Sequence, residues 1–314
     1  MRQILVILLV CLIVACKGDA KEGSAAQRET SPGATSTGFD GNAAYNYAKA
    51  QFDFGPRVPG TPAAKAGGDW IIRQMRARAD TVIVQSFTHT TADGKKLPMR
   101  NILARFRPEL PERVLYVTHW DSRPIAESAA TEAERKLPTP GANDGASGVG
   151  MFVALADLLK KTKPTVGVDL LFTDGEDYGQ FGPPEVDVLI GSRHFAAHPP
   201  SPGYKPLYGV LWDMIGDKDL RIPYEMFSFQ RAPEVVSRVW QAAADMGYGD
   251  IFVQESGGEI NDDHIPLLDA GMRVIDVIDL TYPPHHTPED TMDKISARSL
   301  AIVGDVAAAL VTRK

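Results

Sequence analysis

Hydrophobic and polar positions follow two periods along this chain, and the two periods alternate. Short apolar runs rich in Val, Leu and Ile are typical of buried strands, whereas apolar residues spaced three and four apart are typical of amphipathic helices. Strands are predicted at Thr81–Phe87, Asn101–Phe106, Arg113–Thr118, Val168–Thr173, Leu207–Trp212 and Val274–Ile278. Helices are predicted at Asn42–Phe54, Pro62–Arg78, Val149–Lys161, Ser192–Ala197, Pro233–Met246, Asn261–Ala270 and Ser296–Val311.

The order of these elements predicts an α/β fold. The first two strands flank a turn-prone segment, residues 92–96, and we expect them to form an antiparallel pair at an edge of the sheet. Strand, loop and helix then repeat, which predicts a mixed, mostly parallel sheet with helices on both faces. Ligands of such sheets bind beyond the carboxyl ends of the strands. We expect one large domain over residues 39–314, and no internal repeat is visible.

The N-terminus is typical of an export signal. Met1-Arg2-Gln3 precedes an apolar run, Ile4–Ala15, that is too short to span a bilayer. The run ends at Cys16 and resembles the lipobox of bacterial lipoproteins, in which this cysteine is acylated. An ordinary cleaved signal peptide with a chance cysteine is the alternative. Either way we expect a signal at residues 1–16 and an exported protein, periplasmic or at the cell surface.

Composition narrows the classes of partner. Residues 17–38 are rich in Gly, Ser, Thr and Ala and predict a flexible linker, so we expect membrane contact only through a lipid anchor at Cys16. The net charge of -7, without a basic run, argues against nucleic acid as a partner. The only cysteines are Cys11 and Cys16, so the folded body has neither disulfides nor thiolate metal ligands. We expect a monomer.

Chemically versatile side chains follow the predicted strands. Val168–Thr173 leads directly into Asp174-Gly175-Glu176-Asp177, and buried carboxylates stay charged only where a cation balances them. Two adjacent acids suggest divided labour, one binding a metal and the other acting as a general base or acid. The alternative is a solvated acidic turn.

A set of acids and imidazoles is predicted to meet at one rim of the sheet. Imidazoles and carboxylates without thiolates suit zinc in a catalytic site with an open position. Each residue alone has a structural alternative: a buried core histidine, a helix cap, a strand-end cap or a solvated histidine pair. The set consists of His119, Asp144, Glu176, Asp177, Asp213 and His286.

These motifs resemble, in order and spacing, the co-catalytic zinc aminopeptidase superfamily. The resemblance runs from about Phe54 to the C-terminus and implies a three-layer α/β/α sandwich around a mixed sheet. It rests on His119-x-Asp121, the loop Gly141–Gly148, Asp174-Gly175-Glu176-Asp177 and His286-Thr287.

Within the superfamily the chain looks most like the glutaminyl-peptide cyclotransferases. This narrower resemblance implies a single zinc ion held by Asp144, Asp177 and His286, with Glu176 as the proton shuttle. It also implies an acidic network around the substrate that includes Asp213 and Asp262. It rests on Phe54-Gly55-Pro56-Arg57-Val58-Pro59-Gly60, Gly191-Ser192-Arg193-His194, Trp212-Asp213-Met214-Ile215-Gly216 and Asp262-Asp263-His264-Ile265-Pro266.

Three positions depart from the animal cyclases. Asp177 stands where those enzymes have Glu, and Asp276 and His285 stand where they have His and Trp. The aromatic wall of the pocket is therefore undecided among three candidates. These are Tyr178, Phe181 and Tyr282.

The resemblance implies a reaction on peptides with N-terminal glutamine. The peptide's α-amine attacks the side-chain amide, Glu176 moves the proton, and a pyroglutamyl peptide and ammonia are released. Asp213 and Asp262 favour protonated Glu176 and also hold the substrate amine, although Asp262 also stands where a helix N-cap belongs.

Two other functions stay open. A di-zinc aminopeptidase would use His119 and Asp213 for a second metal, Asp144 as the bridge and Glu176 to activate water. The cyclase is preferred on the stretch Asp262–Pro266 and on Ile215-Gly216. A non-catalytic binding lipoprotein would have lost metal ligands or the base, and none of these is missing.

Overall fold

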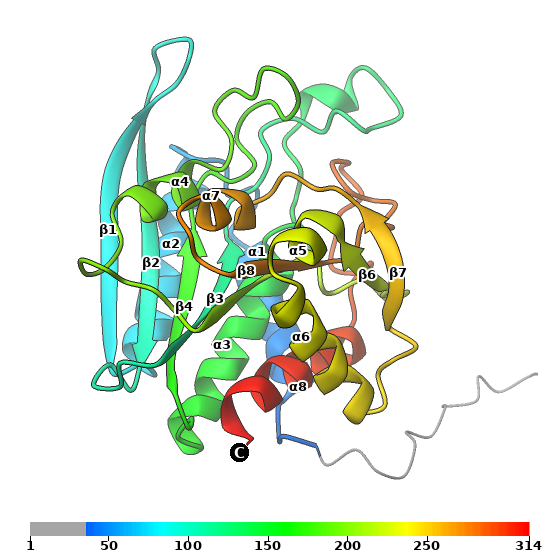
Figure 1. Ribbon diagram of the computed structural model, residues 1–314. Helices are drawn as coiled ribbons and strands as arrows, with labels where there is room; N and C mark the ends of the chain where they lie inside the picture. Colours follow the sequence, from blue (N-terminus) through cyan, green and yellow to red (C-terminus); the bar gives the residue numbers. More distant parts are fainter. Residues whose placement is uncertain (1–35, 314) are drawn as a thin grey trace, which may run out of the picture. The chain divides into compact units, whose positions relative to one another are not determined.

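The computed structural model describes residues 36–313, and all of them lie in the compact unit Gly33–Lys314 (Figure 1). The predicted signal at residues 1–16, with Cys16, and the predicted linker up to residue 35 lie outside the described residues. The last residues of that linker are held in place, because the Thr37 amide donates to Asp305 Oδ1 at 3.1 Å. In the part of the chain described, no helix is long and apolar enough to cross a membrane.

The central sheet is mixed, as predicted. Its six strands lie in the order β1-β2-β4-β3-β5-β8. β1 pairs with β2 and β2 with β4 in antiparallel fashion, whereas the β4-β3, β3-β5 and β5-β8 pairs are parallel. The bounds are β1 Thr81–Thr90, β2 Lys96–Phe106, β3 Arg113–His119, β4 Gly167–Thr173, β5 Tyr208–Asp213 and β8 Val274–Ile278.

Helices cover both faces of the sheet, which completes the three-layer α/β/α sandwich. On β3, Tyr116 packs into the core shared with α1, α2, α3, α6 and α8, while Leu115 and Val117 face the core of α4 and α7. Figure 1 shows α4 and α7 side by side. The bounds are α1 Gly41–Phe52, α2 Pro62–Arg76, α3 Ala146–Lys161, α4 Ile190–Ala197, α6 Pro233–Asp245, α7 His264–Asp269 and α8 Ala297–Thr312.

The sequence prediction missed a small second sheet. β6, Ile222–Glu225, and β7, Phe252–Gly258, pair in parallel, and the short helix α5, Met226–Arg231, follows β6. Their apolar periodicity is weak because β6 is four residues long and most of β7 is exposed. A single 3-10 turn, η1 Glu134–Lys136, was missed as well. The predicted elements are present, with shifted ends.

A buried ion cluster ties the three strands β2, β3 and β4 together. Asp169 of β4 is fully buried and accepts from Arg113 Nε at 2.7 Å and from Arg105 Nε at 3.0 Å. Tyr204 also donates its hydroxyl to Asp169, at 2.8 Å. The buried carboxylate is therefore fully compensated, and removing its charge leaves a buried guanidinium without a counterion.

We expect Asp169→Asn to lower the free energy of unfolding by about 3 kcal/mol, because a buried ion pair loses one partner. Urea unfolding followed by circular dichroism measures the change. Glu132→Gln is the matched control, since Glu132 is 85% exposed in its pair with Lys136 and should contribute less than about 1 kcal/mol. Equal effects of the two substitutions would contradict the assignment.

Candidate metal centre and catalytic site

The parallel strands deliver the predicted site residues to one rim of the sheet. His119 is the last residue of β3 and Asp213 the last of β5. Glu176 and Asp177 follow β4, and His286 lies in the loop after β8. Parallel strands end at the same edge, so these four loops converge there.

Asp144 lies between two imidazoles and is the centre of the site. Its Oδ1 lies 3.1 Å from His119 Nε2, and its Oδ2 lies 3.6 Å from His286 Nε2. His119 Nε2 is also 3.1 Å from Asp213 Oδ1. On the other side, His286 Nε2 is 3.4 Å from Asp177 Oδ1. The three ligands predicted for a single zinc therefore meet at His286, and the residues predicted for a second metal meet at His119.

The tightest groups of potential ligand atoms differ in one member from the prediction. In each of two groups all ligand atoms lie within 4.8 Å of one another; one contains Asp144, His119 and Asp213, the other Asp144, His285 and His286. Asp177 is not in the second group. Its Oδ1 instead accepts from Arg123 at 2.7 Å.

The donor set fits a zinc ion. Asp144 Oδ2 and Asp177 Oδ2 are buried and have no hydrogen-bond partner among the described residues. Such orphaned carboxylate oxygens are costly unless a cation or a proton reaches them. Neutral imidazole and carboxylate oxygen are typical zinc ligands in catalytic sites. Asp144 and His286 offer ligand atoms for one ion together with His285 or Asp177, and His119 and Asp213 offer theirs beside the other oxygen of Asp144.

Electrostatics at the rim show the same need for positive charge. Burial lowers the pKa of His119, but Asp213, Asp121 and Asp144 overcome this effect and raise it well above its usual value. Burial likewise lowers the pKa of His286, yet Asp177, Glu127 and Asp144 raise it to about 10. Without a metal, both imidazoles therefore take up protons to balance the acids around them.

Glu176 lies in the most acidic part of the rim. Burial, then Asp262 and Asp177, raise its pKa well above the usual value for glutamate. Burial, then Asp213 and Asp263, raise the pKa of Asp262 in the same direction. A carboxyl group with a raised pKa can hold a proton near neutral pH, as a proton shuttle requires.

The loop that carries Asp144 depends on a glycine. Gly145 has a φ of +97°, and a Cβ atom there would lie 2.6 Å from Asp121 O. Gly145 is also the N-cap of α3 and makes no side-chain cap, so the helix-capping alternative for Asp144 is wrong. Asp290 fixes the same loop, because its carboxylate accepts from the amides of Asn143 at 2.8 Å and Asp144 at 3.1 Å.

The turn that carries Glu176 and Asp177 is held by Asp121. Its two carboxylate oxygens accept from the amides of Glu176 and Asp177, each at 3.2 Å. Asp121 is fully buried and follows β3 by two residues. The motif His119-x-Asp121 thus places His119 against Asp144 and Asp121 under the turn that carries Glu176 and Asp177.

The segment between β3 and α3 adds two further residues that the sequence did not indicate. Glu127 Oε1 lies 2.8 Å from His286 Nδ1, and Glu127 Oε2 accepts from Arg123 Nε at 2.6 Å. Arg123 in turn donates to Asp177 Oδ1 at 2.7 Å. A carboxylate on the far nitrogen of a metal-binding histidine fixes its ring and its tautomer. The segment has no apolar periodicity, so nothing in the sequence placed it here.

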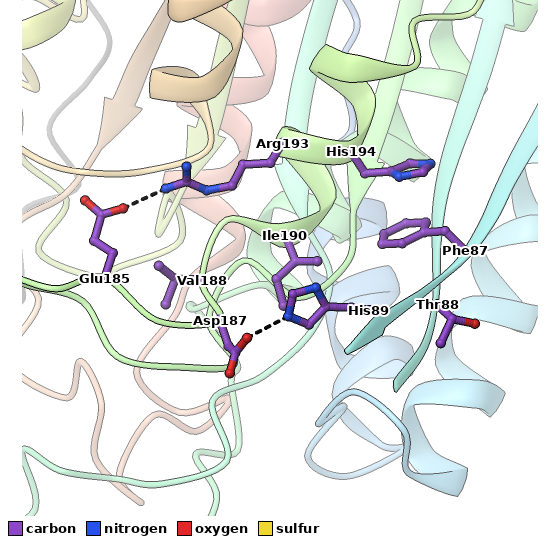
Figure 2. Close-up of a pocket in the computed structure, with 9 residues that line it drawn as sticks. All are labelled: Phe87, Thr88, His89, Glu185, Asp187, Val188, Ile190, Arg193 and His194. Carbon is purple, nitrogen blue, oxygen red and sulfur yellow. Dashed lines mark hydrogen bonds and ion pairs between the residues drawn. The ribbon is translucent and has the colours of Figure 1, made fainter. Parts of the chain in front are cut away.

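The loop after Asp177 is fixed to two neighbouring elements. Figure 2 shows Asp187 paired with His89 of β1 at 2.6 Å, and Glu185 paired with Arg193 of α4 at 2.6 Å. These residues line a surface pocket beside the site, and its charged side chains are paired with one another. These two ion pairs therefore anchor the loop that begins at Tyr178 to β1 and α4.

The structure separates the three candidates for the aromatic wall. Tyr282 is buried and donates its hydroxyl to Asp290 at 2.6 Å. Tyr178 packs in a small cluster with Leu97, Met99 and Ile190. Phe181 lies over the guanidinium of Arg123 at 5.6 Å, next to the residue that binds Asp177. Of the three, Phe181 contacts Arg123, which donates to Asp177.

Comparison with known proteins agrees with this site. Residues 101–311 match the model of peptidase family M28. The chain belongs to peptidase family M28. The matched segment contains every predicted site residue, from His119 to His286.

Solved structures named for two different activities resemble this chain. A Bacteroides thetaiotaomicron glutaminyl cyclase bound to N-acetylhistamine is 36% identical, with a TM-score of 0.85, and the match covers 89% of this chain and 100% of that chain. A leucine aminopeptidase precursor from the same organism is also 36% identical, with a TM-score of 0.85 and coverage of 88% and 98%. The Bos taurus glutaminyl-peptide cyclotransferase is 26% identical over 78% of this chain and 74% of its own length. These similarities confirm the predicted α/β/α fold and the predicted superfamily.

We expect Glu127→Gln to weaken zinc binding by roughly 10- to 100-fold, because His286 loses the carboxylate that orients its ring. Competition with a fluorescent chelator measures the dissociation constant. Glu132→Gln lies in the same segment, is exposed and should leave it unchanged. An unchanged constant for Glu127→Gln would show that this contact does not serve a metal.

Proposed function

We propose that this chain is a glutaminyl-peptide cyclotransferase, which converts an N-terminal glutamine of peptides to pyroglutamate and releases ammonia. The observation that carries the proposal is the similarity, over 89% of this chain, to a bacterial glutaminyl cyclase, together with Glu176 in an acidic, buried setting beside Asp144, Asp177 and His286. Peptide N-termini are then the substrates, and zinc is the cofactor.

When bound, the zinc ion would act as a Lewis acid on the side-chain amide carbonyl of the substrate. Asp144, Asp177 and His286 would hold it. The neutral α-amine of the peptide attacks the amide carbon and forms the new C–N bond. The pKa of a free α-amine is about 7.7–8.0, so a usable fraction of it is neutral near pH 7. Glu176 accepts the proton that this amine loses. The original C–N bond of the amide then breaks, and Glu176 returns the proton so that ammonia leaves.

The neighbouring acids prepare Glu176 for this exchange. Asp262 raises its pKa, and Asp213 in turn raises that of Asp262. An incoming ammonium or amine is stabilised by the same negative potential. Asp213 and Asp262 therefore both tune the shuttle and hold the substrate amine.

An aminopeptidase activity is the second candidate. It is favoured by one specific observation: Asp144 presents one oxygen to His119 and the other to His286, the arrangement that a metal-bridging carboxylate needs. His119 and Asp213 would hold the second ion, and Glu176 would activate a water molecule. The number of ions separates the two functions, one for the cyclase and two for the aminopeptidase.

Incubation of the purified protein with a peptide that begins with Gln should release ammonia. The peptide should keep all its residues and lose only the mass of that ammonia. Glu176→Gln should lower kcat by roughly 10²- to 10⁴-fold, because the amide cannot carry the proton. Coupled ammonia detection and mass spectrometry measure both. Glu132→Gln is the control. Release of free glutamine without ammonia would refute the cyclase assignment and support the aminopeptidase.

We also propose that the chain is exported and anchored through Cys16, on the basis of the apolar run Ile4–Ala15 and the small residue, Ala15, directly before the cysteine. The intact mass of the protein from membranes of an expressing bacterium should correspond to a chain that begins at an acylated Cys16. Cys16→Ser should abolish the added mass and the membrane association. An unmodified Met1 in the isolated protein would refute the proposal.

A further inference from the structure

Asp262 lies in the loop between β7 and α7, and its neighbours on both sides are tied to other elements. Asn261 donates its side-chain amide to Glu185 at 2.8 Å. Thr173, at the end of β4, donates its hydroxyl to Asp263. The side chain of Asp262 is left facing the acids of the rim, which raise its pKa. The position of Asp262 therefore depends on how these flanking residues are held.

Glu225, the last residue of β6, contacts this loop on both sides of Asp262. Its Oε1 accepts from the amide of Ile260 at 3.1 Å, two residues before Asp262. Its Oε2 lies 3.2 Å from His264 Nε2, two residues after Asp262. Glu225 and His264 are both fully buried. One carboxylate thus contacts the loop on both sides of Asp262. Because the site is buried, water cannot take over these contacts.

The same carboxylate is itself rigidly placed. It caps α5 by accepting from the amides of Phe227 at 2.8 Å and Ser228 at 2.6 Å. Burial raises the pKa of Glu225, but the contacts with His264 and with Ser228 overcome this effect and hold it at about 2. The group is therefore a charged acceptor at working pH. A neutral amide in its place would turn an NH2 group toward backbone N–H donors.

We propose that Glu225 is a positioning residue for Asp262, with the small β6-β7 sheet acting through it to set the place of this acid at the active site. The inference deepens the proposed function, and it rests on that function only for the role of Asp262. Glu225 contacts no predicted metal ligand in the described part of the chain, so its influence on the reaction runs through the Ile260–His264 loop.

A double-mutant cycle of Glu225→Gln and Asp262→Asn tests this role. Glu225→Gln alone should lower kcat/KM by roughly 10- to 100-fold, because small displacements of a catalytic group are costly. In the Asp262→Asn background the same change should alter kcat/KM by less than about threefold, because the residue it positions is already disabled. If the fold-losses of the two single variants multiply in the double variant, the two residues act independently and the proposal is overturned. Full activity of Asp262→Asn would also overturn it.

Glu255→Gln is the matched control, because Glu255 lies in β7 of the same small sheet, pairs with Arg221 and has a side chain that is 64% exposed. Its effect on kcat/KM should stay below about threefold. If circular dichroism shows that Glu225→Gln does not fold, His264→Gln removes the other partner and enters the same cycle with the same criterion.

The cycle is measured on ammonia release from a Gln-initiated peptide and on amino-acid release from an aminoacyl anilide. Absence of ammonia release by the wild type refutes the proposed function and leaves the cycle to be completed on the anilide. Coupling between the two sites in either activity supports the positioning role. Independent effects in the activity that the wild type shows refute it.

Discussion

The crowding of buried carboxylates at one rim of the sheet is the constraint on which the rest of this structure depends. Asp144, Glu176, Asp177, Asp213 and Asp262 all follow strands or precede helices there and are shielded from water. Their mutual repulsion must be compensated by cations, by protons or by hydrogen bonds from amide groups. The surrounding structure provides such groups. Two imidazoles lie at the centre of the site, and backbone amides donate to Asp290 and Asp121.

The sequence predicted the part of this arrangement that follows from periodicity and topology. Parallel strands bring distant residues to one edge, so Asp144, Asp177 and His286 could be expected to meet although they are far apart in the chain. The candidate metal ligands could be recognised by residue type and by their place after apolar runs. Family resemblance then assigned the fold and the superfamily, which the comparisons confirm.

The supports of the site could not be predicted in the same way. Arg123 and Glu127 lie in a segment without regular structure, and their contacts depend on where that segment returns to the rim. Glu225 ends a four-residue strand whose parallel partner is mostly exposed, so no periodic signal marked it. Position in space, rather than residue type, gives these side chains their importance. The helix-cap explanation of Asp144 failed for a related reason, because the turn at Gly145 leaves its carboxylate free to face the histidines.

The carboxylate of Asp144 faces His119 with one oxygen and His286 with the other. A scaffold with such a central group does not need rebuilding to pass between chemistries that use one ion and chemistries that use two. The two solved structures of similar shape, one named a cyclase and one an aminopeptidase, fit a scaffold with one shared central carboxylate.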